Sequence, residues 1–160
     1  MLTPLCVADA DVMVGVLGAQ ELHEFIGGRP ADLFELRRRY ERMTAGPGDP
    51  DEVWLNWIMR RAEDGVAVGT VQATVTRDAA EVAWVVGVPW QGRGYAAEAA
   101  AALVDRLFAQ GVHAVTASIH PEHHASAAVA AKAGLVATDR VVDGERIWQI
   151  TRGPNSSVLR

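Results

Sequence analysis

The sequence is poor in cysteine, in long apolar runs and in clustered positive charge, and each shortage excludes a class of protein. Cys6 is the only cysteine among 160 residues, so no internal disulfide can form and a reducing cytoplasm is the expected location. No activating motif surrounds Cys6, which favours a buried or edge-strand thiol over a nucleophile. No apolar run reaches the roughly 18 residues of a membrane-spanning helix, and the start does not resemble a signal peptide. Neither a membrane nor secretion is therefore expected.

The charge balance argues against a nucleic-acid partner. The formal net charge is −5, and no basic stretch offsets it. The most basic run, residues 37–39, precedes Glu41 and Arg42 on an expected helix and is interpreted as a solvated face. Hydrophobic residues make up 49% of the chain, and no repeat or linker divides it. One domain is predicted over residues 1–152, with a flexible tail over residues 153–160.

Hydrophobic periodicity predicts helices and strands that alternate along most of the chain. Helices are expected where apolar residues recur at helical spacing, and strands where they alternate or form short apolar runs. The segments that follow these patterns are helices over residues 9–17, 32–43, 95–110 and 125–133, and strands over residues 53–59, 66–76, 81–88, 112–119, 135–142 and 146–151. This order predicts an α/β (α+β) fold with a mixed, mostly antiparallel central sheet flanked by helices.

Two strands carry more specific expectations. The strand over residues 81–88 is mostly apolar, so it is expected to be buried on both faces and to end at Pro89. Trp54 and Trp57 cannot both face the interior of their strand, which makes one of them a candidate for lining a substrate cleft.

The segment from Val85 to Ala97 carries the clearest functional signal. It is predicted to be a strand, a glycine-containing loop and the start of a helix. Such a junction presents unpaired backbone N–H groups and the positive end of the helix dipole. Glycine lets the backbone approach a ligand closely, and Arg93 adds a cation. The segment therefore suits a pyrophosphate.

A dinucleotide is one ligand of this kind. The spacing Gly92-x-Gly94-x-x-Ala97 matches the dinucleotide fingerprint formally. That fingerprint also requires an acidic residue at the end of the next strand, whereas here Ile119 is followed by His120. An NAD-dependent oxidoreductase is thus a weaker alternative.

Coenzyme A is the other ligand, and here the chain resembles a known family. Residues 91–96, Gln-Gly-Arg-Gly-Tyr-Ala, look like the Gln/Arg-x-x-Gly-x-Gly/Ala signature of the GNAT superfamily of N-acetyltransferases. Residues 81–86 resemble the strand before this loop, and residues 120–135 resemble the family's Pro-x-Asn-x-x-Ser … Lys-x-Gly-Phe segment. The combination is typical of the branch with the ribosomal-protein N-terminal acetyltransferases and many small-molecule acetyltransferases. The resemblance covers about residues 54–148.

The resemblance implies a reaction and a set of site residues. Acetyl-CoA would be the co-substrate, and its acetyl group would pass directly to a primary amine of a small molecule or a protein N-terminus. The arm of the coenzyme would pair with the main chain of Val86 and Val88 in a splay between strands. His123 would donate a hydrogen bond to the coenzyme, and Ser126 would lie near its thiol. The residues implied to hold or shape the pyrophosphate site are Gln91, Gly92, Arg93, Gly94, Tyr95 and Ala96.

The catalytic groups are less determined than the coenzyme site. Glu81 is the candidate base, with a water-mediated proton transfer as the alternative. The N–H of Val86 would stabilise the oxyanion. Many family members place a tyrosine acid where this chain has Ala130, so Ser126 or water would have to serve. An acetyl-CoA-binding module with little catalysis is therefore the alternative function. Identity of the acceptor and homodimer formation are left open.

A metal site is not expected. Residues 120–124 hold three histidines and a glutamate, but Pro121 interrupts them and their spacing matches no zinc motif.

Overall fold

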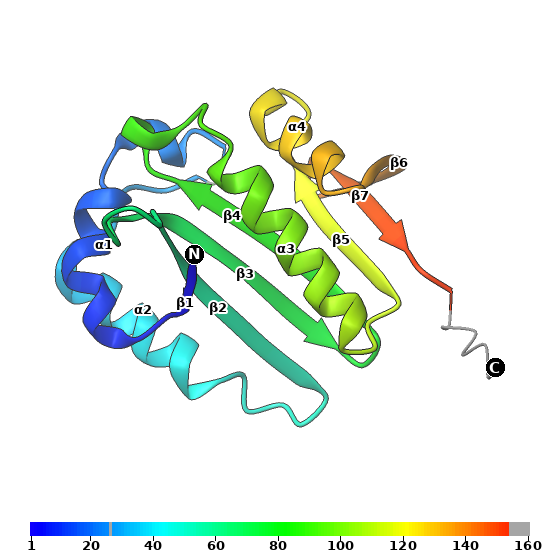
Figure 1. Ribbon diagram of the computed structural model, residues 1–160, viewed down its shortest axis with the longest axis horizontal. Coiled ribbons are helices and arrows are strands. Elements are labelled where there is room, and N and C mark those ends of the chain that lie inside the picture. The colour runs from blue at the N-terminus through cyan, green and yellow to red at the C-terminus, as the bar shows by residue number, and fades with distance from the viewer. Residues whose placement is uncertain (26, 154–160) are drawn as a thin grey trace.

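One seven-stranded sheet organises the protein in the computed structural model, which describes residues 1–25 and 27–153 (Figure 1). The strand order is β1-β2-β3-β4-β5-β7-β6, and only β4 and β5 run parallel. This confirms the predicted mixed, mostly antiparallel sheet. The strands are β1 (Leu2–Pro4), β2 (Glu52–Arg60), β3 (Ala67–Thr76), β4 (Ala79–Val86), β5 (Ala114–Ile119), β6 (Val136–Val142) and β7 (Glu145–Thr151).

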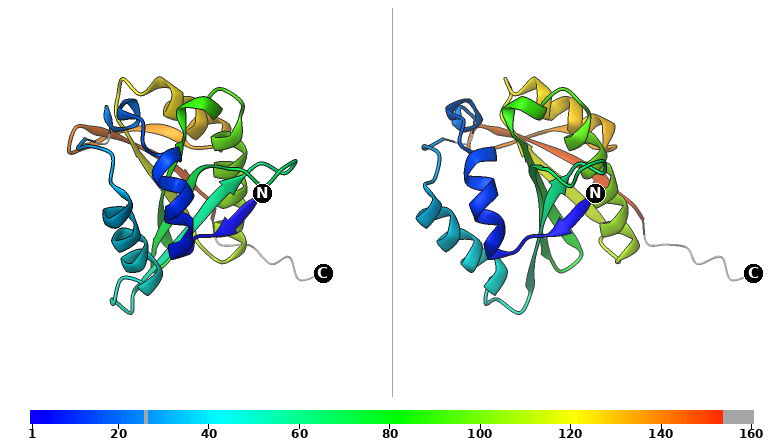
Figure 2. Two further views of the ribbon diagram at one scale, coloured as in Figure 1. Left: turned by 90° about the vertical axis from the view of Figure 1, so that its left-hand side faces the viewer. Right: turned by 60° about the vertical axis from the view of Figure 1, so that its left-hand side comes forward.

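Helices cover both faces of the sheet. Two lie on one face and α3 lies on the other, with α4 beside it (Figure 2). The α-helices are α1 (Ala10–Val16), α2 (Leu33–Ala45), α3 (Tyr95–Ala109) and α4 (His124–Lys132), and the short 3-10 turns are η1 (Val7–Asp9), η2 (Gln20–His23) and η3 (Val88–Trp90). All four predicted α-helices are confirmed, with ends that differ from the prediction by one or two residues.

Each face has its own core. Under α3, the alternate β4 residues Val82 and Val86 pack with Leu103 and Leu107 of the helix. On the other face, Ile58 of β2 packs with Met13 of α1 and with α2. Burying these apolar faces is the main force that fixes both helix layers on the sheet.

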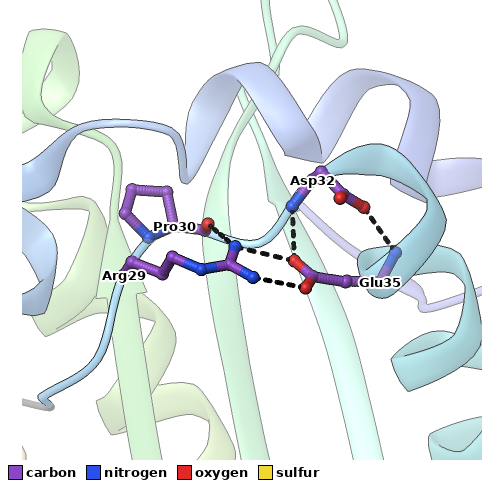
Figure 3. Close-up of polar contacts among 4 residues, drawn as sticks. All are labelled: Arg29, Pro30, Asp32 and Glu35. Carbon is purple, nitrogen blue, oxygen red and sulfur yellow. Dashed lines mark hydrogen bonds and ion pairs between the residues drawn. The ribbon is translucent and has the colours of Figure 1, made fainter.

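The start of α2 shows how the sequence sets a helix boundary (Figure 3). Asp32 accepts a hydrogen bond from the backbone N–H of Glu35 at 2.8 Å, and Glu35 accepts one from the backbone N–H of Asp32 at 2.9 Å. This reciprocal pair is a capping box. Arg29 donates two hydrogen bonds to Glu35, at 2.6 and 3.0 Å, and the hydrogen bond from Arg29 is the main reason why the pKa of Glu35 falls to about 2.

Two predictions about burial are wrong. Cys6 is exposed because it lies past the end of β1, where its backbone N–H donates to Asp9 at 2.8 Å and opens η1. Strand β4 is not buried on both faces, since Glu81 and Ala83 are exposed on the face opposite α3. Helices α1 and α2 cover β2 and β3 there, and leave this part of β4 uncovered.

The domain boundaries stay predictions. Residues 154–160 of the predicted tail lie outside the described residues. Among the residues described, no helix has both the length and the apolar character needed to cross a bilayer.

Candidate active site

Strands β4 and β5 separate in the middle of the sheet. They pair only between Ala79–Glu81 and Ala114–Thr116. Beyond these residues β4 pairs with β3 alone, and β5 pairs with β7 alone. The two strands diverge toward the loop that precedes α3 (Figure 1). The predicted splay is therefore present at the predicted place.

The backbone of β4 offers hydrogen-bonding groups to this opening. Gly87 N–H donates to the carbonyl of Val68 in β3 at 2.8 Å. Since the direction of hydrogen bonding alternates along an antiparallel strand, the main-chain groups of Trp84 and Val86 face the splay. The Val86 carbonyl accepts a hydrogen bond from the side-chain amide of Gln91 at 2.9 Å. The Val86 N–H faces the opening, as its predicted oxyanion role requires.

A cavity of about 730 Å³ occupies the splay. Its walls come from four parts of the chain: η2 and the residues after it, the second half of β4 with the loop into α3, the end of β5 with α4, and the start of β7. The lining residues include Glu21, Glu24, Phe25, Trp84, Val86, Trp90, Gln91, Gly92, Gly94, Tyr95, Ala96, Ser118, His120, His123, Ser126, Lys132 and Glu145.

The loop into α3 has the backbone geometry that an anion site needs. Gly92 and Gly94 have φ angles of +76° and +85°, and a Cβ on either would meet no atom within 4 Å. Gly94 is the N-cap of α3 and provides no side chain to cap the helix. The first N–H groups of this 15-residue helix are therefore left for a ligand at its positive end.

Most of the predicted coenzyme residues line the cavity, with two exceptions. The side chain of Arg93 is exposed, and the residue is not among those that line the cavity. Val88 also lies outside the lining, because η3 turns it toward solvent and its carbonyl accepts the backbone N–H of Gln91 at 3.3 Å. The pairing between Val88 and the coenzyme arm stays a prediction.

Glu81 lies at the closed end of the splay and does not itself line the cavity. It is exposed, and its Oε1 accepts a hydrogen bond from Ser118 Oγ at 3.3 Å. Ser118 does line the cavity. Glu81 can therefore reach a substrate only through Ser118 or through water.

Three rings meet at the start of α4. His123 stacks on Phe25 with 4.4 Å between ring centroids and 9° between ring planes, and His120 lies 5.3 Å from Phe25. The Nε2 of His123 lies 3.3 Å from Ser126 Oγ. Burial, and next the charge of His120, lower the pKa of His123, while Glu24 opposes the shift.

Sequence patterns did not indicate the part of the cavity that the N-terminal segment provides. Phe25 and Glu24 lie almost 100 positions before His123, and no periodicity or motif connects the two segments. The prediction that Trp54 or Trp57 lines the cleft is wrong. Trp57 packs in the core under α3 and near Arg106, at 5.7 Å, and the tryptophans in the cavity wall are Trp84 and Trp90.

Two negative observations concern the chemistry. Ala130 is fully buried in the core under α3, so the position where many family members have a tyrosine offers no proton donor. Within residues 1–25 and 27–153, no three His, Cys, Asp or Glu side chains lie close enough together to hold a metal ion.

The comparisons with known proteins agree with this geometry. The family model described as acetyltransferase (GNAT) domain matches residues 1–136. The chain belongs to this family, which confirms the expectation of an acetyl-CoA-dependent N-acetyltransferase with acetyl-CoA as co-substrate. No curated protein matches the sequence.

Several solved structures share the fold. The aminoglycoside acetyltransferase AAC(6')-Ib, in complex with paromomycin and acetyl-CoA, is 18% identical with a TM-score of 0.79, over 95% of this chain and 93% of that one. A Vibrio cholerae protein assigned as a ribosomal-protein-serine acetyltransferase is 16% identical with a TM-score of 0.72, over 94% and 92%. A chimera of the Vibrio cholerae spermidine N-acetyltransferase with hSSAT is 16% identical with a TM-score of 0.73, over 94% of both chains.

Proposed function

We propose that the protein transfers the acetyl group of acetyl-CoA to a primary amine of a small polycationic molecule. The observation that carries this proposal is the lining of the cavity between β4 and β5, which combines the loop before α3 with the N-terminal segment after η2. Each of these two parts has groups suited to a different substrate.

The part beside α3 suits the coenzyme. The N–H groups of Gly94, Tyr95 and Ala96 would hold the pyrophosphate at the start of the helix. The main chain of Trp84 and Val86 would pair with the extended arm of the coenzyme, much as another strand would. Lys132 of α4 also lines this cavity and adds a cation for a phosphate group.

Other parts of the lining suit a cation. Glu21 and Glu24 come from the N-terminal segment, and Glu145 comes from β7. None of these three carboxylates has an ion-pair partner among the described residues. Unpaired carboxylates around one opening attract amines and hold them close to the thioester.

The reaction needs a neutral amine and a stabilised oxyanion. Amines with a pKa well above neutrality are mostly charged, so a group that accepts a proton assists attack. Glu81, through Ser118 or water, is the predicted acceptor of that proton. The N–H of Val86 would stabilise the negative charge on the carbonyl oxygen.

Related folds support the choice of acceptor. The structures similar to this chain include an aminoglycoside acetyltransferase and a spermidine N-acetyltransferase. A ribosomal-protein acetyltransferase also shares the fold, so a protein N-terminus is the acceptor to test against the small polycations. A cytoplasmic location and a homodimer stay predictions.

The test begins with calorimetric titration of acetyl-CoA, with NAD as the control ligand. Release of thiol is then measured with spermidine, an aminoglycoside, a monoamine that carries no other charged group, and a peptide with a free N-terminus. We expect micromolar binding of acetyl-CoA alone and the highest kcat/KM for the polycations. Failure to bind acetyl-CoA, or thiol release with the peptide only, would contradict the proposal.

Charge variants test the part of the lining proposed for the acceptor. Glu24→Gln should raise KM for the polycation roughly two- to fivefold, as expected for a partly exposed charge pair, and leave the Kd of acetyl-CoA unchanged. Glu41→Gln, an exposed substitution on α2 outside the cavity, is the matched control. Equal KM values for the two variants would remove Glu24 from acceptor binding.

A further inference from the structure

The hydrogen bond between Ser126 and His123 joins a hydroxyl and a titratable ring inside the cavity. Ser126 Oγ and His123 Nε2 are 3.3 Å apart, and both residues line the cavity wall. His123 is the N-cap residue of α4, and Ser126 lies in the first turn of that helix. The ring lies flat against Phe25, with 9° between the ring planes. In this position its Nε2 faces the Ser126 hydroxyl.

A second hydroxyl in the cavity wall is hydrogen-bonded to a titratable side chain: Ser118 donates to Glu81. Among the described residues, no other carboxylate or imidazole is hydrogen-bonded to a hydroxyl that lines the cavity. The two pairs differ in exposure. Glu81 is exposed and outside the lining, whereas His123 is half-buried and part of it. With Ala130 buried in the core, Ser126 and His123 are the two groups at the start of α4 that bond to each other and can pass a proton between them.

We propose that Ser126 and His123 carry the proton of the attacking amine to the departing sulfur. Ser126 would touch the reacting atoms, and His123 would act through it as a positioning and proton-storing residue. This inference rests on the proposed function and assigns a second route for the proton, separate from Glu81.

The steps balance without any further reagent. The amine nitrogen forms a bond to the thioester carbon, and its surplus proton passes to Ser126 Oγ while the Ser126 proton passes to His123 Nε2. The bond between that carbon and the sulfur then breaks, and the electron pair stays on sulfur. His123 returns its proton to Ser126 Oγ, and the hydroxyl proton passes to the thiolate. The products are the acetylated amine and the free thiol.

The relay requires His123 to be neutral before the amine attacks. Its surroundings favour that form, because burial and the neighbouring His120 lower its pKa. His120 Nδ1 accepts a hydrogen bond from the backbone N–H of Glu122 at 3.1 Å. The other titratable groups that line the same cavity are Glu21, Glu24, Tyr95, Glu122, His124, Lys132 and Glu145. Activity should therefore fall as the pH decreases through the lowered pKa of His123.

The test compares pH profiles of kcat for the full chain and four variants. His123→Asn keeps a polar side chain that does not titrate, Ser126→Ala removes the hydroxyl, and the double variant combines them. His113→Asn is the matched control, since His113 lies just before β5 and outside the cavity. Dividing each variant's profile by that of the wild type cancels the ionisation of the acceptor.

We expect kcat to fall about tenfold in His123→Asn and about 10- to 100-fold in Ser126→Ala, with KM for acetyl-CoA within about twofold. His123→Asn should also lose the acidic limb of the profile. The double variant should be no slower than Ser126→Ala alone, because the two residues act in series.

Three results would overturn the relay. One is an acidic limb that persists in His123→Asn, and another is a double variant whose losses multiply. The third does not depend on turnover: NMR titration of the histidine rings could show a pKa of His123 at or above the ordinary value of 6.5. If the wild type binds acetyl-CoA but releases no thiol with any amine, the proposed function fails, and the relay fails with it.

Discussion

Gly69 is the residue at which a single methyl group should disturb the site most directly. It lies in β3 opposite Val86, next to an irregularity where β2 and β3 change register. A Cβ at this position would lie 2.2 Å from the carbonyl oxygen of Val85 and 3.0 Å from the Cα of Val86. Both atoms belong to the backbone of β4, so no side chain can move aside. Gly69→Ala must therefore push β4 away from β3 at the edge of the splay.

The size of the effect follows from that contact. Real Cβ atoms do not approach backbone oxygen closer than about 3 Å, so the strands must separate by close to an ångström. Overpacking usually costs 1–3 kcal/mol, and a rigid obstacle favours the upper end, about 3 kcal/mol. For a chain of this length, that loss corresponds to a decrease in Tm of roughly 6–12 °C. Affinity for acetyl-CoA should also fall, because Val86 moves.

The assay is thermal unfolding followed by circular dichroism, paired with calorimetry of acetyl-CoA. Gly15→Ala is the matched control, since Gly15 lies exposed in α1 and a Cβ there meets no atom within 4 Å. Alanine should stabilise that helix by about 0.5–1 kcal/mol, so the two identical changes should shift Tm in opposite directions. A Tm for Gly69→Ala within 2 °C of the wild type would refute the close approach of β3 and β4.

Three further predictions test other parts of the structure. Gly94→Glu should weaken acetyl-CoA binding beyond calorimetric detection while the fold survives, because a carboxylate would occupy the proposed pyrophosphate site. An unchanged affinity for acetyl-CoA would show that this loop does not bind the coenzyme. Glu35→Gln should lower Tm at pH 7 much more than at pH 2. A folded pKa of about 2, below the ordinary 4.5, gives stability that is fully present above pH 4.5 and is largely lost as the pH falls through 2; equal effects at both pH values would contradict the ion pair with Arg29. Tyr40→Phe should raise Tm by a few degrees, because the buried Tyr40 hydroxyl has no hydrogen-bond partner among the described residues; a lower Tm would show that the hydroxyl is satisfied in solution.

The loop and helix start proposed for the coenzyme could be predicted because local sequence determines their geometry. A strand that ends in a loop with two glycines needs positive φ angles, and Gly92 and Gly94 have them. The helix that follows starts at Tyr95, as the pattern of alanine and leucine indicated. Local patterns of this kind need no knowledge of distant contacts, so they transfer directly to the structure.

The remaining features of the fold and of the candidate site depend on contacts between segments that are distant in the sequence. Strand β1 is three residues long and exists because Leu2 pairs with Met59, which no local pattern reveals. Apolar residues in β4 suggested burial on both faces. The exposure of β4 is instead decided by α1 and α2, which do not extend over this part of the sheet. Phe25 reaches His123 through the course of the N-terminal segment, which also carries Glu21 and Glu24 to the cavity.

The arrangement divides the site into parts that kinetics can separate. In the proposed function, backbone groups around Gly94 hold the coenzyme, so changes there should act on the affinity for acetyl-CoA. Side chains such as Glu24 are proposed to attract the acceptor and should act on its KM. His123 and Ser126 lie where the two parts meet, so they should act on kcat and on its pH dependence. A variant of Glu24 that weakens acetyl-CoA binding as strongly as Gly94→Glu would mean that both substrates share one opening, and the charge of the acceptor would then have to be inferred again.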